Sequence, residues 1–239
     1  MKLNDPDLVR RQYRTEAGLA VRRDAVARFR EGPDAVDVAL LAAVAAPSPR
    51  RVLEVGCGMG QFAERLVGEI DLELVAVDLS PRMVELARER GVDARVGDAQ
   101  RLAFRDAQFD CVVANWMLYH VDDLELALAE FVRVLVPGGR LVAATVGEKH
   151  MREVWELMGF LPPLRPFSRE NGEETLRRYF AKVERHDVDA VLVFPDVASV
   201  HDYVESTFFS DAVPRPLPEP GVPFRSRTVN AVFIAETAA

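Results

Sequence analysis

The 239-residue chain is poor in cysteine and histidine, and it carries less positive than negative charge. It has two cysteines and four histidines, and 30 lysines and arginines face 38 aspartates and glutamates, which gives a formal net charge of −8. A broad phosphate-binding surface needs the opposite sign of charge, so the composition argues against nucleic acid as a partner. An apolar run long enough to span a bilayer is also missing, and the first residues are polar, so we expect neither a membrane segment nor a signal peptide.

The scarcity of cysteine and histidine narrows the chemistry further. Cys57 and Cys111 both fall in or beside expected core strands, which argues against a disulfide and favours a reducing, cytoplasmic setting. The histidines are scattered without partners at metal-ligand spacing, so we expect no metal site. We expect a monomer or a homodimer.

Buried strands and amphipathic helices alternate along the chain. This alternation predicts a parallel sheet with helices on both faces. The expected strands are 51–55, 74–77, 92–97, 109–114, 140–146, 182–194 (as one strand or two) and 228–236. The expected helices are two within 1–46, separated at Gly32–Pro33 and ending at Pro47, and then 61–66, 80–90, 122–135, 149–160, 171–180 and 196–208. Residues 137–139 should form a turn, and the proline-rich stretch 214–223 a loop.

The most informative segment runs from Val52 to Gly60. It is a buried strand that leads directly into a turn with glycine at positions 56, 58 and 60. Such a turn lets the backbone approach a nucleotide-like ligand closely. A dinucleotide fingerprint, G-x-G-x-x-G, would need its third glycine at position 61, where the chain has Gln61. The spacing is instead G-x-G-x-G, and the acidic Glu54 precedes it.

Four segments, in order along the chain, resemble the motifs of class I (Rossmann-like) S-adenosylmethionine-dependent methyltransferases of the small-molecule, quinone-biosynthesis type. They are Glu54–Gly60, Val75–Ser80, Gly97–Ala99 and Leu135–Leu141. The resemblance covers about residues 51–146. It implies an α/β fold with a doubly wound, seven-stranded, mostly parallel sheet and an antiparallel last strand. It also implies S-adenosyl-L-methionine as cofactor and S-adenosyl-L-homocysteine as product.

The resemblance implies contacts to each part of the cofactor. Asp78 ends the second expected strand, where a carboxylate can accept hydrogen bonds from two ribose hydroxyls. Asp98 would face the adenine edge, and Glu54 would favour the positive charge of the amino-acid end. Aspartates at strand ends also serve as ordinary turn residues, and that alternative stays open. The expected cofactor-binding residues are Tyr13, Arg22, Glu54, Gly56, Cys57, Gly58, Gly60, Asp78, Leu79, Met83, Asp98, Ala99 and Asn115. Among them, Cys57 is expected as a small residue of the turn and not as a nucleophile, because nothing nearby supplies a base.

The reacting groups should lie after the fourth expected strand, because ligands bind beyond the carboxyl ends of parallel strands. Tyr119 and His120 are the candidate catalytic residues there, with His120 as a possible base or, alternatively, as a helix cap. Tyr13 and Arg22 lie in the N-terminal helical region, which we expect to fold over the cofactor; the alternative is a solvated basic helix face. Trp155, Phe160 and Phe167 are candidates for an apolar acceptor pocket; the alternative is that each packs in the core.

We therefore expect a helical cap over residues 1–46 and a methyltransferase domain over residues 47–239, with a variable segment at 148–223. The expected function is methyl transfer from S-adenosylmethionine to a small-molecule acceptor, carried by in-line positioning and exclusion of water. Two alternatives stay open: an RNA or protein methyltransferase, and a protein that binds S-adenosylmethionine without turnover. The identity of the acceptor and the methylated atom cannot be inferred from the sequence.

Overall fold

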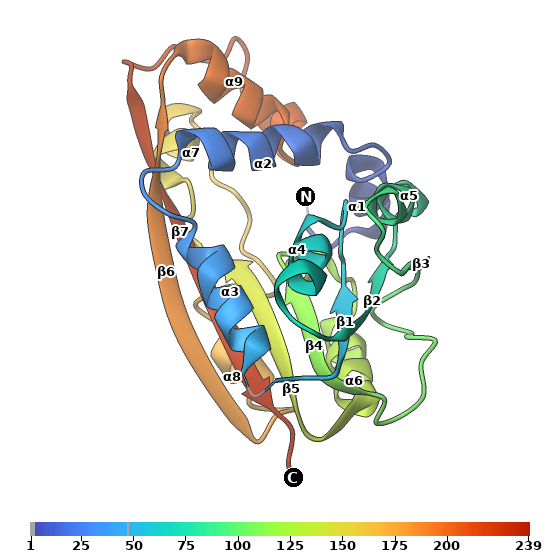
Figure 1. Cartoon of the computed structure of the whole chain (residues 1–239). Helices are drawn as coiled ribbons and strands as arrows, with labels where there is room; N and C mark the ends of the chain where they lie inside the picture. Colours follow the sequence, from blue (N-terminus) through green and yellow to red (C-terminus); the bar gives the residue numbers. More distant parts are fainter. Residues whose placement is uncertain (1–2, 47) are drawn as a thin grey trace.

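Seven strands form one sheet in the order β3-β2-β1-β4-β5-β7-β6 (Figure 1). The computed structural model describes residues 3–46 and 48–239, so the expected helix end at Pro47 lies outside the described residues. β7 pairs antiparallel with both β5 and β6, and the first five strands pair in parallel. The predicted α/β fold with an antiparallel last strand is confirmed. The strands are β1 (Arg51–Val55), β2 (Glu73–Asp78), β3 (Ala94–Val96), β4 (Phe109–Asn115), β5 (Leu135–Val146), β6 (Lys182–Phe194) and β7 (Phe224–Glu236).

The order of the strands determines where a ligand can bind. The chain builds outward from β1 through β2 to β3, then returns to the other side of β1 with β4 and β5. The connections after β1 and after β4 therefore lead to opposite sides and leave a crevice at the carboxyl ends of these strands. The glycine turn at residues 56–60 follows β1 directly into this crevice.

Helices cover both faces of the sheet. On one face, α6 (Leu124–Val134) and α8 (Gly172–Leu176) bury apolar side chains that include Phe131 and Leu176 against β1, β4, β5 and β7. On the other face lie α3 (Ala35–Ala45), α4 (Gln61–Glu69) and α5 (Pro81–Glu89), with Leu40, Leu66 and Ala87 in the packing. Burial of apolar surface on both faces explains why the central strands are almost uniformly apolar.

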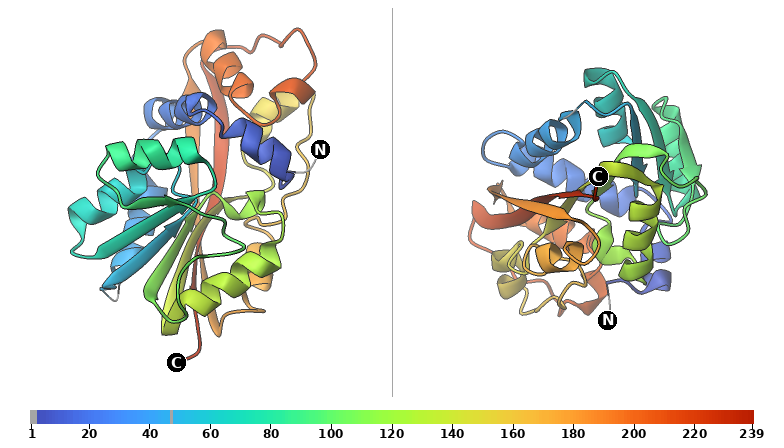
Figure 2. Two further views of the ribbon diagram at one scale, coloured as in Figure 1. Left: turned by 90° about the vertical axis from the view of Figure 1, so that its right-hand side faces the viewer. Right: turned by 90° about the horizontal axis from the view of Figure 1, so that it is seen from below.

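A separate cap lies above the carboxyl ends of the strands, at the end of the molecule opposite the C-terminus (Figures 1 and 2). It contains α1 (Pro6–Gln12), α2 (Ala17–Phe29), α7 (Arg152–Leu157) and α9 (Val197–Glu205). Its own apolar core joins Ala25 of α2 to Trp155, Phe194 and Val204. The two shortest helices are the 3₁₀ turns η1 (Leu118–His120) and η2 (Ser210–Ala212). The N-terminal cap is thus built together with the variable segment.

The boundary of the cap differs from the expected one at residue 46. α3 packs against the sheet through Leu40 and Val44, and the cap ends earlier, near the end of α2. Position along the chain predicts that all the helices before the first strand belong to the cap. The strongly apolar composition of α3 instead requires the large buried face that only the sheet offers.

Capping residues and glycines in the sequence explain where α5 begins and ends. Ser80 caps α5 by accepting a hydrogen bond from the Met83 amide, and Pro81 fills the first helical position. Gly91 ends the same helix region with a φ of 83°. The expected turn at residues 137–139 is an outward bulge inside β5, where the register against β4 is interrupted. None of the helices within residues 3–46 and 48–239 has the length and apolar character that a bilayer crossing requires.

Candidate functional site

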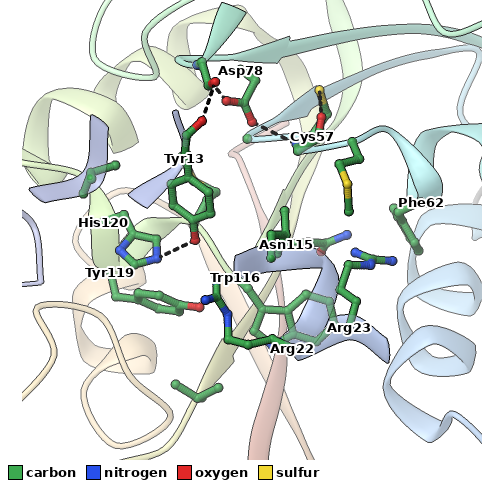
Figure 3. A pocket seen from close by; sticks show the side chains of 18 of the residues that line it. Tyr13, Arg22, Arg23, Cys57, Phe62, Asp78, Asn115, Trp116, Tyr119 and His120 are labelled. Carbon is green, nitrogen blue, oxygen red and sulfur yellow. Dashed lines mark hydrogen bonds between the residues drawn. The ribbon is translucent and has the colours of Figure 1, made fainter. Parts of the chain in front are cut away.

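A cavity of about 1670 Å³ lies between the carboxyl ends of the parallel strands and the cap. Ligand pockets usually enclose about 300–1000 Å³, so this cavity has room for two small molecules side by side. Its wall combines the glycine turn, the end of β2, the segment that follows β4 and helix α2 (Figure 3). The segment after β3 and residues from α7, α9, β6 and β7 complete the wall. The sequence motifs and the variable segment therefore face one shared space.

Two glycines of the turn are required by packing and by backbone conformation. Gly56 and Gly60 have φ values of 74° and 78°, in the left-handed region that favours glycine. A Cβ on Gly56 would lie 2.7 Å from the Cβ of Met117, and a Cβ on Gly60 would lie 2.8 Å from the Cβ of Ala87 in α5. Gly60 does not line the cavity. Its expected contact with the cofactor is replaced by a helix-packing role.

Gly58 opens toward the cavity. It has a φ of 54°, and a Cβ there would meet only Leu19 of α2, at 3.4 Å. Its amide donates to Oδ2 of Asp78 at 2.8 Å, while the Ser80 amide donates to Oδ1 at 2.9 Å. These bonds hold the Asp78 carboxyl at the end of β2, facing the glycine turn. Burial raises the pKa of Asp78, and the hydrogen bonds from the backbone oppose that effect.

Glu54 and Asn115 bring unpartnered polar atoms to the same wall. Glu54 is only 2% exposed, and its Oε2 has no hydrogen-bond partner within the described residues. Both the Oδ1 and the Nδ2 of Asn115 are also buried without a partner. Burial and the charge of Asp78 raise the pKa of Glu54 to about 8, although the positive charge of Arg23 acts in the opposite direction. Buried polar atoms are normally satisfied, so these three atoms indicate a ligand with both donors and acceptors and with positive charge.

The segment after β3 contributes a second carboxylate. Asp98 and Ala99 line the cavity, and Oδ1 of Asp98 accepts from the Gln100 amide at 2.9 Å. Leu79 also lines it, with 41% of its surface exposed. Met83 does not, because the first turn of α5 directs its side chain into the protein, where it is fully buried. The expectation that Met83 is one of the cofactor-binding residues is therefore corrected.

Cys57 lines the cavity as a buried residue of the turn. Burial raises the pKa of its thiol strongly, and the neighbouring charges of Glu54 and Asp78 add to this effect. A thiol held in its protonated form is a poor nucleophile, as the sequence led us to expect. Cys111 is also free and buried, in β4.

Tyr13 and His120 form a hydrogen-bonded pair on the cap side of the cavity. The Tyr13 hydroxyl lies 3.1 Å from Nε2 of His120, and Nδ1 of His120 lies 3.2 Å from the carbonyl oxygen of Leu3. A carbonyl only accepts, so Nδ1 carries the proton and the Tyr13 hydroxyl donates to Nε2. Burial lowers the pKa of His120 to about 3, with a further lowering from Arg22 and Arg165. The imidazole is therefore neutral, and both of its nitrogens are occupied.

Arg22 lines the cavity from α2, as expected, and its guanidinium donates to the carbonyl of Ser206 at the end of α9. It also lies over the ring of Phe208, 5.8 Å from the ring centroid. Tyr119 lines the cavity beside His120, and burial raises the pKa of its hydroxyl. The fold thus brings together all expected site residues except Gly60 and Met83.

Several lining residues were not identified from the sequence. Arg23 lies on α2, one position from Arg22, and nothing in its local pattern distinguishes it from a solvated arginine. Others come from the variable segment and from the last two strands, where no motif marks them; they are His150, Arg165, Tyr203, Phe208 and Asn230. In these segments the sequence pointed to three aromatic residues. Trp155 does line the cavity, but Phe160 and Phe167 do not, and Phe167 is fully buried in the core against the sheet.

Residues 53–143 match the family model described as "Methyltransferase domain". The matched segment includes the glycine turn, Asp78, Asp98 and the strands that hold them. The domain belongs to the class I, Rossmann-like S-adenosylmethionine-dependent methyltransferases, and this class implies dependence on that cofactor. The family expected from the four motifs is confirmed.

Two curated relatives match part of the chain. A demethylmenaquinone methyltransferase of Deinococcus radiodurans is 42% identical over 104 residues, which cover 41% of this chain and 43% of that protein. A malonyl-[acyl-carrier protein] O-methyltransferase of Erwinia pyrifoliae is 37% identical over 123 residues, or 49% of this chain and 47% of that protein. The chain thus spans less than half the length of these curated relatives.

Solved structures extend the likeness to the whole fold. A Thermotoga maritima protein described as "SAM-dependent methyltransferase, possible histamine N-methyltransferase" has a TM-score of 0.62 at 25% identity, covering 95% of this chain and 99% of that one. A [4+2]-cyclase has a TM-score of 0.65 at 20% identity over 100% of this chain and 98% of that one. At that identity the cyclase shows the fold alone. Because one neighbour is named for a different reaction, the fold by itself does not define the chemistry.

Proposed function

We propose that this protein transfers the methyl group of S-adenosylmethionine to a small-molecule acceptor. The observation that carries the proposal is the unsatisfied pair Glu54 and Asn115, which faces the same cavity as Asp78 across an open glycine turn. An adenosyl amino acid offers a cationic amine, a carboxylate and two vicinal hydroxyls. A pyrophosphate would instead place negative charge beside two buried carboxyls, which is unfavourable.

The residues of the cavity fit such a cofactor. Asp78 would accept hydrogen bonds from the ribose hydroxyls, and Asp98 with the Ala99 amide would face the adenine edge. Glu54 and Asn115 would hold the amino-acid end. When bound, the cofactor supplies a methyl group that is already strongly electrophilic. The protein then needs to orient the acceptor in line with the methyl group and to exclude water.

The cap is suited to exclude water. Two contacts join it to the start of α5, beside Asp78. Ser80 Oγ donates to the Tyr13 carbonyl at 2.7 Å, and Arg82 pairs with Glu16 at 2.9 Å. His120 fixes the Tyr13 hydroxyl at the wall of the cavity. Since His120 is buried and neutral with an occupied Nε2, we propose that it positions Tyr13 and that proton transfer by His120 is secondary.

A small acceptor is favoured because the part of the cavity farther from the strand ends lies under α2 and α9. Phe208 and Trp155 contribute apolar surface to this region. A nucleic acid or folded protein would need the cap to move away before it could reach the methyl group. Of the two curated relatives, one is named for a small molecule, demethylmenaquinone, and the other for a malonyl group carried on an acyl-carrier protein.

Calorimetry with S-adenosylmethionine and S-adenosylhomocysteine tests the proposal directly. We expect both to bind, with one site per chain. Asp98→Ala should weaken both, whereas Asp71→Ala, in the loop before β2 and outside the cavity wall, should change neither. If neither compound binds at millimolar concentration to the folded protein, the proposed function is wrong.

A further inference from the structure

The cavity has two halves that differ in their charged side chains. The lining of the half at the strand ends includes the carboxyl groups of Glu54, Asp78 and Asp98. The wall contributed by residues 146–230 contains no aspartate or glutamate, but it does contain Arg165. Because the proposed cofactor is cationic, the first half matches its charge. The second half must match a molecule of a different kind.

Arg165 is a buried cation with incomplete compensation. Only 8% of it is exposed, and the one carboxylate within reach, Glu148, lies 3.7 Å from its Nη1. A charge-assisted hydrogen bond is shorter, about 2.7–2.9 Å. The same Nη1 lies 3.5 Å from the Gly147 carbonyl, at the limit of hydrogen bonding. A buried guanidinium is costly unless it is paired, so this side chain has capacity left for an anion.

Arg22 faces the same space from the cap. Its hydrogen bond goes to a neutral carbonyl, that of Ser206. The positive charges of Arg22 and Arg165 both influence Tyr119, His120 and Tyr203, which places the two guanidiniums around a common cluster. Figure 3 shows Arg22, Tyr119 and His120 converging on the cavity.

Neutral groups in this half add hydrogen-bond donors. Trp155 lines the cavity, and its buried indole Nε1 has no partner within the described residues. An indole nitrogen can only donate. Tyr119 and Tyr203 also line the cavity, and burial raises the pKa of both hydroxyls, so both stay protonated and able to donate. Two cations and several donors together offer a site for an oxyanion.

We propose, on the basis of the proposed function, that the methyl acceptor carries an oxyanion, a carboxylate or a phosphate, held by Arg165, Arg22 and the Trp155 N–H. The aromatic side chains of Phe208 and Phe209, which also line the cavity, contact the apolar body of the same molecule. The bound anion fixes the orientation of the acceptor. The different charged groups of the two halves favour the cofactor in one half and the acceptor in the other.

The test measures binding to the full chain saturated with S-adenosylhomocysteine. The probes are benzoate, phenyl phosphate, inorganic phosphate and the neutral benzamide, each titrated by calorimetry and by thermal shift. We expect benzoate or phenyl phosphate to bind at least about 10-fold more tightly than benzamide, the scale of one hydrogen bond to a charged group. A preference between the two organic anions separates carboxylate from phosphate recognition. Binding of inorganic phosphate alone would contradict the proposed apolar contact.

Two variants locate the site. Arg165→Gln should weaken anion binding by about 10- to 100-fold while S-adenosylhomocysteine binds as in the wild type. Trp155→Phe keeps the ring but removes the N–H, and should weaken anion binding less strongly. The matched control is Arg152→Gln, since Arg152 is an exposed arginine of α7 paired with Glu156. Because Trp155→Phe preserves the packing, it keeps the test decisive even if Arg165→Gln fails to fold.

The outcomes separate the two proposals. If S-adenosylhomocysteine fails to bind the wild-type protein, the proposed function fails. If it binds but benzamide binds as tightly as the anions, the oxyanion site is refuted and the proposed function stands. Anion binding that both Arg165→Gln and Trp155→Phe leave unchanged would equally refute this location.

Discussion

Binding of a cationic ligand beside Glu54 is expected to expel a proton from the protein. Burial raises the pKa of Glu54 from its ordinary value of 4.5 to about 8. At pH 7 such a carboxyl is protonated in about nine molecules of ten, and at pH 9 in about one of ten. A bound ammonium group next to it favours the charged form and lowers its pKa. Binding should therefore release about 0.9 proton at pH 7 and about 0.1 at pH 9.

Calorimetry in several buffers measures this release. S-Adenosylhomocysteine is titrated at pH 7 in phosphate, HEPES and Tris, and the observed enthalpy is plotted against the ionisation enthalpy of the buffer. The slope gives the number of protons exchanged. The matched variant is Glu54→Gln, which keeps the shape of the side chain but cannot ionise. We expect its slope to fall close to zero, although Asp78, whose pKa burial also raises, remains in place.

The same pKa shift predicts how stability depends on pH. Because the pKa of Glu54 is higher in the folded than in the unfolded protein, its contribution is fully present below about pH 4.5 and is lost as pH rises through about 8. The midpoint of thermal unfolding without ligand should therefore decline across this window in the wild type but not in Glu54→Gln.

The calorimetric experiment can refute the reasoning about Glu54. It does so if the wild-type protein binds the ligand at pH 7 with an enthalpy that does not depend on the buffer.

Three further predictions concern the other site residues. Asp78→Ala should weaken S-adenosylhomocysteine binding by about 1–3 kcal/mol, the scale of hydrogen bonds to a charged group, and wild-type affinity in calorimetry would contradict the ribose contact. Gly58→Val should abolish binding while circular dichroism shows a folded protein; Gly68→Val, where a Cβ meets nothing within 4 Å, is the control and should bind normally. His120→Ala should lower kcat, yet leave the shape of the pH–rate profile between pH 5 and 8 unchanged, because the pKa of His120 is about 3. A wild-type inflection near pH 6.5 that disappears in the variant would show that His120 titrates there.

Most of the fold could be predicted because the central strands are short, apolar and punctuated by glycine and proline. β1 is found at the residues expected, Arg51–Val55. The errors occur where tertiary pairing overrides local pattern. β7 begins at Phe224, four residues before the expected start, because the long β6 offers backbone partners as far as Phe194. α7 begins at Arg152 rather than 149, after Met151 in a left-handed conformation that no sequence signal indicated.

The candidate site divides in the same way. The carboxylates that face the proposed cofactor lie at strand ends: Glu54 is in β1, Asp78 ends β2 and Asp98 follows β3, so short motifs are enough to predict that they meet at one wall of the cavity. Arg165 and Tyr203 reach the cavity from segments whose positions depend on how the cap packs, and neither lies in a local pattern that indicates a ligand. The side of the cavity proposed to recognise the acceptor is therefore formed by tertiary packing, which single-sequence patterns do not reveal.

His120 is a residue for which the sequence pattern and the tertiary structure suggest different roles. From the sequence it is a candidate base at the end of a strand. In the structure its Nδ1 binds the Leu3 carbonyl and its Nε2 accepts from Tyr13, so one imidazole joins two points of the cap to the segment after β4. Protonation would turn Nε2 into a donor and force the Tyr13 hydroxyl to reverse. The folded protein therefore binds fewer protons at His120 than the unfolded chain between about pH 3 and 6.5, and this contribution to cap closure is lost as pH falls through that range. This geometry supports the proposed positioning role of His120, a structural link that holds only while the histidine is neutral, over the role of a base.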